Sequence, residues 1–349
     1  MAPPQQPPSN TTIIGLSGPS SSGKTTLARL LQRIFSKLSP DLHDPSLNTF
    51  IVHEDDFYHS DDKIPLTPHP RNPTQKIQNW DTITALNTPF LVSSLQYIKA
   101  HGRLPPRLRS KEDLNDVTAS NVPEAVVEEL RGVVRGRVPE YFTSRVDGEG
   151  EGEGEGGIRR TIVFLDGFLL FAPPREEDPG HGLRAVNDLM DVRLFLPARY
   201  ENVKERRESR SGYVTIGPAP TVPNEEGEDG TEVPQGGSAG EEQEEVDLEK
   251  EDDGPAQNFW TDPPGYVDDI VWPNYVQDHA WLLLPEEGSQ TRLPKADAPE
   301  LVRLVGQGVN LRMDAGVTVA PGQGNASMVD ILKWAVEEVL KHIEETEGQ

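Results

Sequence analysis

The 349-residue chain contains no cysteine, which excludes disulfides, thiolate nucleophiles and zinc sites built from cysteine. Long apolar runs are also missing. The longest, Thr161 to Pro173, is interrupted by Asp166 and Gly167 and falls short of the ~20 residues that a membrane-spanning helix needs. The first ten residues lack a basic stretch followed by an apolar one, so no secretory signal is visible. We therefore expect a cytoplasmic protein without a membrane partner, and the nucleus is a second compatible compartment.

Apolar residues are few, at 34%, and the chain contains 32 prolines and 31 glycines, so part of it must lie outside a packed core. Most of the net charge of -25 falls in two acidic tracts, 147–155 and 224–253, which cannot bury enough apolar surface to fold. The remainder carries only about -7, which argues against a nucleic-acid partner. We predict a disordered N-terminus, residues 1–10, and one domain over 11–349 that insertions interrupt at about 107–158 and 217–257.

Short apolar runs alternate with stretches in which apolar residues recur at helical spacing. The pattern predicts strands at Thr11–Leu16, Thr49–His53, Thr161–Leu165 and Val192–Leu196, and helices at Lys24–Leu38, Tyr200–Arg210 and Ser327–Glu344. Residues 107–141 are expected to form a partly helical insertion. Strands that alternate with helices predict an α/β fold with a mostly parallel sheet covered on both faces.

Residues 18–25, Gly-Pro-Ser-Ser-Ser-Gly-Lys-Thr, match the phosphate-loop pattern G-x-x-x-x-G-K-[ST], and they lie between a predicted strand and a predicted helix. The glycines allow amide N–H groups to turn inward, and the helix directs its positive dipole end at the same point. Such a loop binds ATP, with the lysine on the β- and γ-phosphates and the threonine hydroxyl on Mg²⁺. The predicted ATP-binding residues of this loop are Gly18, Ser20, Ser21, Ser22, Gly23, Lys24, Thr25 and Thr26. Asp166, at the end of a predicted strand, is the expected second metal ligand beside Thr25.

Nucleotide binding alone does not distinguish a GTPase switch, a mechanical ATPase and a small-molecule kinase. The Asn-Lys-x-Asp guanine reader of GTPases is absent, and the third residue after Asp166 is Leu169 where a GTPase switch has glycine. Asp55 and Asp56 instead follow the second predicted strand, where open α/β sheets bind substrates. Because a hydroxyl acceptor needs a carboxylate to orient it and take its proton, Asp55 is the candidate base. His53 is expected to pack at the strand end.

Four basic residues, Lys204, Arg206, Arg207 and Arg210, lie on one predicted helix and the turn after it. They could close over the triphosphate as a lid, supplying positive charge and excluding water. A solvated helix face explains the same residues more simply. Beside a phosphate loop and an acceptor carboxylate, we favour the lid.

Several short stretches together resemble the nicotinamide riboside kinases, particularly the fungal ones. They are residues 15–26, 53–58 (His-Glu-Asp-Asp-Phe-Tyr), 79–81 (Asn-Trp-Asp), 166–168 (Asp-Gly-Phe) and 206–210 (Arg-Arg-Glu-Ser-Arg), with a less diagnostic stretch at 258–266. The resemblance covers roughly 11–104, 159–215 and 258–284. It is specific in combination, whereas the phosphate loop alone is not.

The resemblance implies an NMP-kinase-like P-loop NTPase fold, with a five-stranded parallel sheet, flanking helices and a lid. It also implies ATP- and Mg²⁺-dependent phosphorylation of the ribose 5′-hydroxyl of nicotinamide riboside, and of nicotinic acid riboside, in NAD salvage. The matching positions give Asp55 as the catalytic base with Lys24, Asp56 on the substrate side and Asp81 on the ribose 2′- and 3′-hydroxyls. The remaining matches are Tyr58, Trp80 and Tyr213 around the pyridine ring, Arg207 on the substrate side, and Arg206 and Arg210 toward ATP.

The chain departs from this family at two insertions and at residues 285–325, so its adenine-binding loop is unassigned. A uridine/cytidine kinase shares the phosphate loop, the base and the lid and is one alternative. A second is an inert nucleotide-binding scaffold whose acidic segment recruits a partner. Single residues also have plainer explanations: Tyr58 and Trp80 as core aromatics, and Asp81 as the N-cap of a helix that begins near Ile83. No sequence feature indicates an oligomeric state.

Overall fold

The computed structural model of the protein describes residues 11–36, 38, 47–108, 110, 120–138, 160–216, 257–283 and 314–347. The N-terminal ten residues and both acidic tracts lie outside these ranges. Across the helices of this described part, none is both long enough and apolar enough to cross a membrane.

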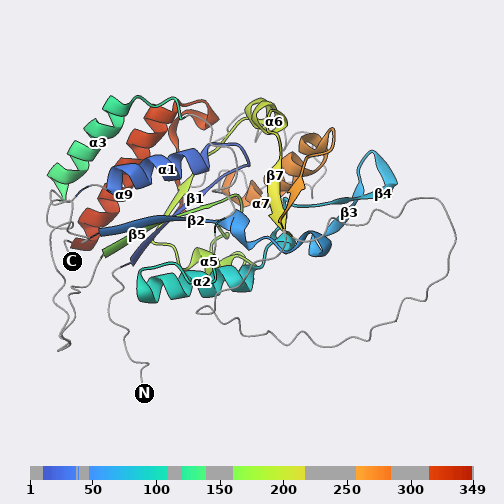
Figure 1. Ribbon diagram of the computed structural model, residues 1–349, viewed down its shortest axis with the longest axis horizontal. Coiled ribbons are helices and arrows are strands. Elements are labelled where there is room, and N and C mark those ends of the chain that lie inside the picture. The colour runs from blue at the N-terminus through green and yellow to red at the C-terminus, as the bar shows by residue number, and fades with distance from the viewer. Residues whose placement is uncertain are drawn as a thin grey trace, which may run out of the picture.

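A five-stranded parallel sheet forms the centre of the molecule (Figure 1), and its strand order is β2-β5-β1-β6-β9. The strands are β1 (Thr11–Ser17), β2 (Leu47–His53), β5 (Arg160–Gly167), β6 (Val192–Phe195) and β9 (Thr318–Val319). Four of them confirm the predicted strands, and the α/β class with five parallel strands is confirmed as well. The fifth strand has only two residues and was not predicted from the residue pattern.

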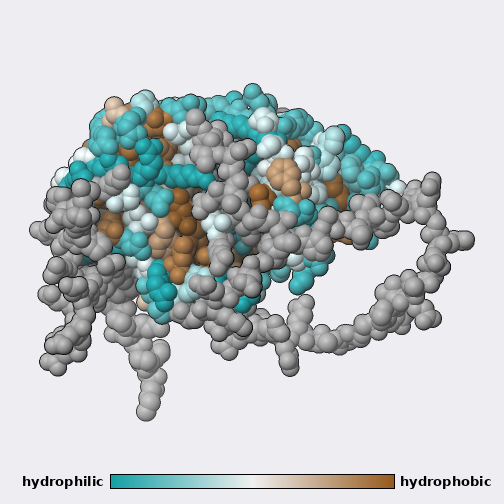
Figure 2. All heavy atoms as spheres, in the orientation of Figure 1, coloured by the Kyte–Doolittle hydropathy of each residue, from teal (hydrophilic) through white to brown (hydrophobic). Residues whose placement is uncertain are grey.

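Helices cover both faces of this sheet, as Figure 1 shows. One face packs against α1 (Lys24–Phe35), α3 (Glu124–Arg137) and α9 (Met328–Glu347); the other packs against α2 (Thr88–His101), α5 (Arg184–Asn187) and α7 (Trp272–Leu283). Neighbouring residues of one strand supply opposite faces, since Ile13 belongs to one buried cluster and Ile14 to the other. In Figure 2 the outer surfaces of the helices are mainly hydrophilic.

Helix α3 lies within the interval 107–158 that the sequence predicts to be an insertion, in the stretch expected to be partly helical. Val127, Leu130 and Val134 of α3 belong to the buried cluster that α1 and α9 form on the sheet. The spacing of these residues, three and four apart, places them on one side of the helix. At least this part of the interval therefore belongs to the packed core.

Shorter elements gather beyond the carboxyl ends of the strands. They are the 3₁₀ helices η1 (Glu54–Phe57), η2 (Asp61–Lys63) and η3 (Ile83–Ala85), the hairpin of β3 (Leu66–His69) and β4 (Asn72–Gln78), α6 (Tyr200–Glu208), the π-helix η5 (Val267–Val271) and the 3₁₀ helix η7 (Pro321–Gly324). Helix α6 confirms the helix predicted at 200–210.

Two strands in this region, β7 (Tyr213–Ile216) and β8 (Gln257–Trp260), pair with each other although they are far apart in sequence. The pairing is antiparallel, with Tyr213 opposite Trp260. The residues that connect them, 217–256, include the second acidic tract. This tract is therefore inserted between the two strands of a hairpin.

Candidate active site

A cavity of about 1080 Å³, partly open to solvent, lies at the carboxyl ends of β1, β2 and β5. Parallel α/β sheets bind ligands at this edge. The predicted site residues that line it are Ser20, Ser21, Gly23, Lys24, Thr25, Thr26, Asp55, Tyr58, Trp80, Asp81, Asp166, Arg207, Arg210 and Tyr213. Those that do not are Gly18, Ser22, Asp56 and Arg206. Residues far apart in the chain thus meet around one space.

The loop between β1 and α1 has the backbone that an anion site requires. Gly18 and Gly23 have φ values of 149° and 99°, and Ser21 also lies in the left-handed region at 62°. At Gly18 a Cβ atom would come within 2.2 Å of the Leu196 carbonyl oxygen, so only glycine fits. The hydroxyls of Ser21 and Ser22 are buried without a hydrogen-bond partner in the part of the chain described. Unpaired donors beside a helix N-terminus suit a phosphate.

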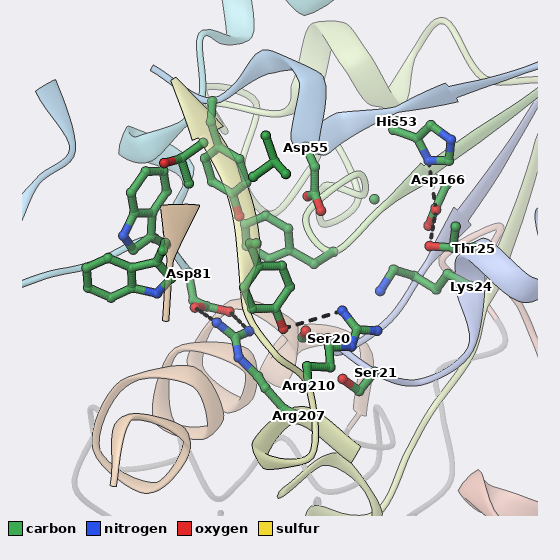
Figure 3. A pocket seen from close by; sticks show the side chains of 18 of the residues that line it. Ser20, Ser21, Lys24, Thr25, His53, Asp55, Asp81, Asp166, Arg207 and Arg210 are labelled. Atoms are coloured by element: carbon green, nitrogen blue, oxygen red, sulfur yellow. Dashed lines mark hydrogen bonds and ion pairs between the residues drawn. The ribbon is translucent and has the colours of Figure 1, made fainter. Parts of the chain in front are cut away.

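Lys24 is the first residue of α1 and is buried, with its Nζ atom donating to the Pro19 carbonyl at 3.0 Å. Burial lowers the pKa of Lys24, and the carboxylates of Asp166 and Asp55 oppose that shift. Figure 3 shows the side chain extending into the cavity. A desolvated cation whose only described hydrogen bond is to a carbonyl of its own loop is well placed to exchange that bond for a phosphate oxygen.

Thr25, Asp166 and His53 form a short chain of contacts on the same side of the cavity (Figure 3). The Thr25 hydroxyl donates to Oδ2 of Asp166 at 2.5 Å, and Nδ1 of His53 lies 3.2 Å from the same oxygen. Burial would raise the pKa of Asp166, but His53 and Lys24 overcome this effect and hold it below its ordinary value. Asp166 is therefore ionised at neutral pH.

His53 was expected to pack at a strand end, and this expectation was incomplete. It is buried, yet it lines the cavity and contacts Asp166. The reason is strand register: His53 and Asp166 are paired positions on the neighbouring strands β2 and β5. Both predicted strands end in a polar residue, and this shared feature was the available signal.

Asp55, on η1, points into the cavity from the side opposite Arg210 (Figure 3). Within the described ranges, no hydrogen bond or ion pair engages its carboxylate, whereas Asp56 beside it is buried and does not line the cavity. Burial and the nearby Asp166 carboxylate raise the pKa of Asp55, and Lys24 partly offsets the rise. A carboxylate of increased basicity, free to accept a proton, fits the predicted base.

Asp81 is bound by Arg207 of α6 through both oxygens, at 3.0 and 3.1 Å, and Arg207 also contacts Asp262 at 2.6 Å through Nε. All three side chains are largely buried. Burial disfavours the cation, but the carboxylates of Asp81 and Asp262 raise the pKa of Arg207 above its usual value. Asp81 is not a helix N-cap: Thr82 occupies that position before η3, without a side-chain bond. Asp262 was not predicted from the sequence.

Aromatic rings form the wall of the cavity that adjoins Asp81. Tyr58 packs edge-on to Trp80, with ring centroids 5.3 Å apart, and lies nearly parallel to Phe168 at 6.1 Å. Trp260 of β8 lies 5.7 Å from Trp80. Trp80 belongs to the buried core and also lines the cavity, so its place in the core does not exclude contact with a ligand. Tyr213 also lines the cavity, and the guanidinium carbon of Arg207 lies over its ring, 5.4 Å from the ring centroid.

Helix α6 closes another side of the cavity. Arg206 donates to the Ser21 carbonyl at 3.2 Å, so it reaches the phosphate loop although it does not line the cavity. Arg210 lines the cavity and donates to the Tyr213 hydroxyl at 3.4 Å. Lys204 instead contacts Asp268 at 2.6 Å. The cluster is therefore divided: Arg207 and Arg210 line the cavity, Arg206 binds the phosphate loop, and Lys204 binds Asp268.

A phosphate loop, a free carboxylate and an arginine-bearing helix around one cavity define the class of P-loop kinases. No protein-family model matches the chain. It is 29% identical to a nicotinamide riboside kinase of Schizosaccharomyces pombe over 274 residues, 78% of this chain and 81% of that protein. Nicotinamide riboside kinases of Eremothecium gossypii and Saccharomyces cerevisiae are 27% and 26% identical, again over 78% of this chain, covering 77% and 79% of those proteins. These similarities support assignment of the chain to the nicotinamide riboside kinase family.

Proposed function

We propose that the protein transfers the γ-phosphoryl group of ATP to the ribose 5′-hydroxyl of nicotinamide riboside, and of nicotinic acid riboside, as a step of NAD salvage. One observation carries the proposal: the phosphate loop, Asp55 and Asp81 line a single cavity. The three similar fungal proteins, each named nicotinamide riboside kinase, point to the same acceptor.

The phosphate loop binds the donor. Its inward amides and the unpaired hydroxyls of Ser21 and Ser22 surround the phosphates, and Lys24 leaves the Pro19 carbonyl to contact the β- and γ-phosphates. Arg206 of α6 and Arg210, two residues after the end of this helix, place positive charge where negative charge develops during transfer.

Thr25 and Asp166 would hold Mg²⁺. The fit rests on their chemistry: a hydroxyl and an ionised carboxylate meet at the mouth of the phosphate loop, and magnesium prefers such oxygen ligands. Within the described ranges, no cluster of three or more histidine or acidic side chains forms a larger metal site. Magnesium usually takes one or two protein oxygens and completes its shell with phosphates and water. When bound, it neutralises charge on the β- and γ-phosphates.

Asp81 and Asp55 act on the acceptor. Each Asp81 oxygen is held by Arg207 and retains a lone pair, so the carboxylate can accept the ribose 2′- and 3′-hydroxyls. The 5′-oxygen of the ribose forms a bond to the γ-phosphorus while the bond between that phosphorus and ADP breaks, and Asp55 accepts the proton that the 5′-hydroxyl loses. Tyr58 and Trp80 offer aromatic faces and edges to the cationic pyridinium ring, with Tyr213 nearby.

Transfer of radiolabelled γ-phosphate to a panel of nucleosides tests this function. We expect labelled product with both pyridine ribosides in the presence of Mg²⁺, and much less with uridine and cytidine. A preference for uridine or cytidine would instead identify the pyrimidine nucleoside kinase. Binding of ATP without any phosphorylated product would identify an inert scaffold.

A further inference from the structure

Glu54 is a fully buried acid beside the candidate base, and the proposed chemistry does not use it. It is the first residue of η1, and it does not line the cavity. Its Oε2 atom accepts two backbone hydrogen bonds, from the amide of Phe168 at 2.7 Å and from that of Leu169 at 3.0 Å. Its other oxygen, Oε1, is buried without a partner within the described ranges. Glu54 thus joins the end of β2 to the turn that follows β5.

The approach is so close that Gly167 cannot carry a side chain. A Cβ atom at this position would lie 2.5 Å from Oε2 of Glu54 and 2.7 Å from its Cβ. Steric contact therefore explains the glycine of the Asp-Gly-Phe sequence. Asp166 faces the phosphate loop, Gly167 leaves room for the Glu54 side chain, and Phe168 lines the cavity.

The Phe168 backbone is fixed on both sides. Glu54 binds its amide, while its carbonyl accepts from the Ser17 hydroxyl at 3.3 Å and from the imidazole of His279. These contacts come from three separate elements, η1, β1 and α7. A backbone held in this way sets the position of the Phe168 ring, which lines the cavity and stacks on Tyr58.

Glu54 also belongs to the same short helix as Asp55. Asp55 of η1 is the candidate base, and Glu54, the residue before it, binds the backbone of Phe168, whose ring is part of the aromatic wall. Both described hydrogen bonds of Glu54 go to the turn after β5, and within the described ranges none goes to the phosphate loop. The geometry predicts that loss of Glu54 would disturb the acceptor side of the cavity and leave the donor side in place.

We propose that Glu54 is a positioning residue, which fixes the Phe168 wall relative to Asp55 and so determines how tightly the riboside is bound. This inference rests on the proposed riboside kinase activity. The Glu54 side chain acts through the Phe168 backbone and does not touch the substrate. It needs one acceptor oxygen at the Oε2 position and no negative charge. Burial supports this, because it raises the pKa of Glu54 to about 8 despite the two amide bonds, so that the acid is mainly neutral at pH 7.

Two substitutions separate the acceptor oxygen from the charge. Glu54→Gln keeps an oxygen for the two amides, and we expect both Michaelis constants to stay within about threefold of the parent values. Glu54→Ala leaves the two amides unpaired; we expect the KM for nicotinamide riboside to rise about tenfold or more and the KM for ATP to change less than about twofold. Phe168→Ala should raise the riboside KM similarly. The double variant should show little further increase, because both changes remove the same wall.

Asp191→Ala is the matched control for loss of a carboxylate that binds backbone. Asp191 accepts from the Ile13 amide at 2.7 Å and from Lys99, near the amino ends of the strands and away from the cavity. It should lower stability without a selective change in the riboside KM. Circular dichroism melts of every variant exclude assays on unfolded protein.

The outcomes divide cleanly. A selective rise in riboside KM for Glu54→Ala, restored by glutamine and non-additive with Phe168→Ala, supports the positioning role. Equal changes in both Michaelis constants, or additive effects of the two substitutions, overturn it while the proposed function stands. A failure of Glu54→Ala to fold, together with a glutamine variant that loses riboside affinity, also overturns it. A parent enzyme without riboside kinase activity overturns both proposals.

Discussion

Arg207 holds both carboxylate oxygens of Asp81, at 3.0 and 3.1 Å, across 126 residues of sequence. The arginine belongs to α6, and the aspartate precedes η3 on the acceptor side. Asp262 binds the same guanidinium from β8's side of the cavity. Asp81, Arg207 of α6 and Asp262 therefore form one buried network of ion pairs, which fixes the orientation of the Asp81 carboxylate.

This relationship predicts that Arg207→Lys is not a conservative change. A lysine cannot form the two parallel bonds to Asp81 while it also holds Asp262. We expect kcat/KM for nicotinamide riboside to fall by about 30-fold or more, mainly through KM, because one buried carboxylate loses its partner. Steady-state kinetics with each substrate varied in turn will test it. Arg175→Lys, at an exposed ion pair with Asp188, is the control. Unchanged riboside kinetics would show that the pair is structural only.

The second prediction concerns Asp55. Replacement by asparagine keeps the shape and removes the basicity, so we expect kcat to fall by about 10²–10⁴-fold with ATP affinity nearly unchanged. ATP binding is measured by titration calorimetry and turnover by radiolabel transfer. Asp62→Asn, at an exposed position of η2, should behave as the parent enzyme. Loss of ATP binding in Asp55→Asn would mean that this carboxylate serves the donor.

The third prediction concerns the metal ligands. Asp166→Asn removes the ionised oxygen that Thr25 and His53 contact, so the Mg²⁺ concentration for half-maximal activity should rise by about tenfold or more. Activity measured over a series of free Mg²⁺ concentrations, at fixed total ATP, provides the value. Chelation of the metal should abolish parent activity reversibly. An unchanged Mg²⁺ requirement would remove Asp166 from the metal site.

The parts of the fold that could be predicted are those whose pattern is local. Buried parallel strands are continuous apolar runs, so β1, β2, β5 and β6 were visible, and α9 repeats its apolar residues at helical spacing from Met328 to Ile343. Strand β9 has two residues, and its position depends on its pairing with β6. Helix α3 falls in the stretch 107–141 that was expected only to be partly helical, and its burial depends on α1 and α9, which are distant in sequence.

The candidate site divides in the same way. The phosphate loop is contiguous, and Asp55 and Asp166 follow predicted strands, so these residues could be selected from the chain alone. Glu54 and Asp262 could not, because their contacts join residues 55 to 114 positions apart on different elements. His53 depends on the register of β2 and β5, and the polar residue at the end of both strands is its only sequence signal.

The last prediction follows from the charge state of Glu54. Burial raises its pKa from an ordinary value near 4.5 to about 8. Below pH 4.5 the acid is protonated in both the folded and the unfolded chain, so its contribution to stability is fully present. As pH rises toward 8, the unfolded chain releases this proton and the folded chain keeps it, so stability is lost progressively through that window. Glu54→Gln cannot ionise and escapes the loss.

The difference in free energy of unfolding, Glu54→Gln minus the parent protein, should therefore increase between pH 5 and pH 8, by up to about 4 kcal/mol. Urea denaturation at four pH values in this range measures the difference, and other titrating groups cancel because both proteins share them. Glu129→Gln, at an exposed position of α3, should show no such trend. A difference that is constant with pH, or that shrinks as pH rises, would mean that Glu54 is ionised in the folded protein. The two amides of the Phe168 turn would then be held by a buried negative charge beside Asp55, and glutamine could not replace it.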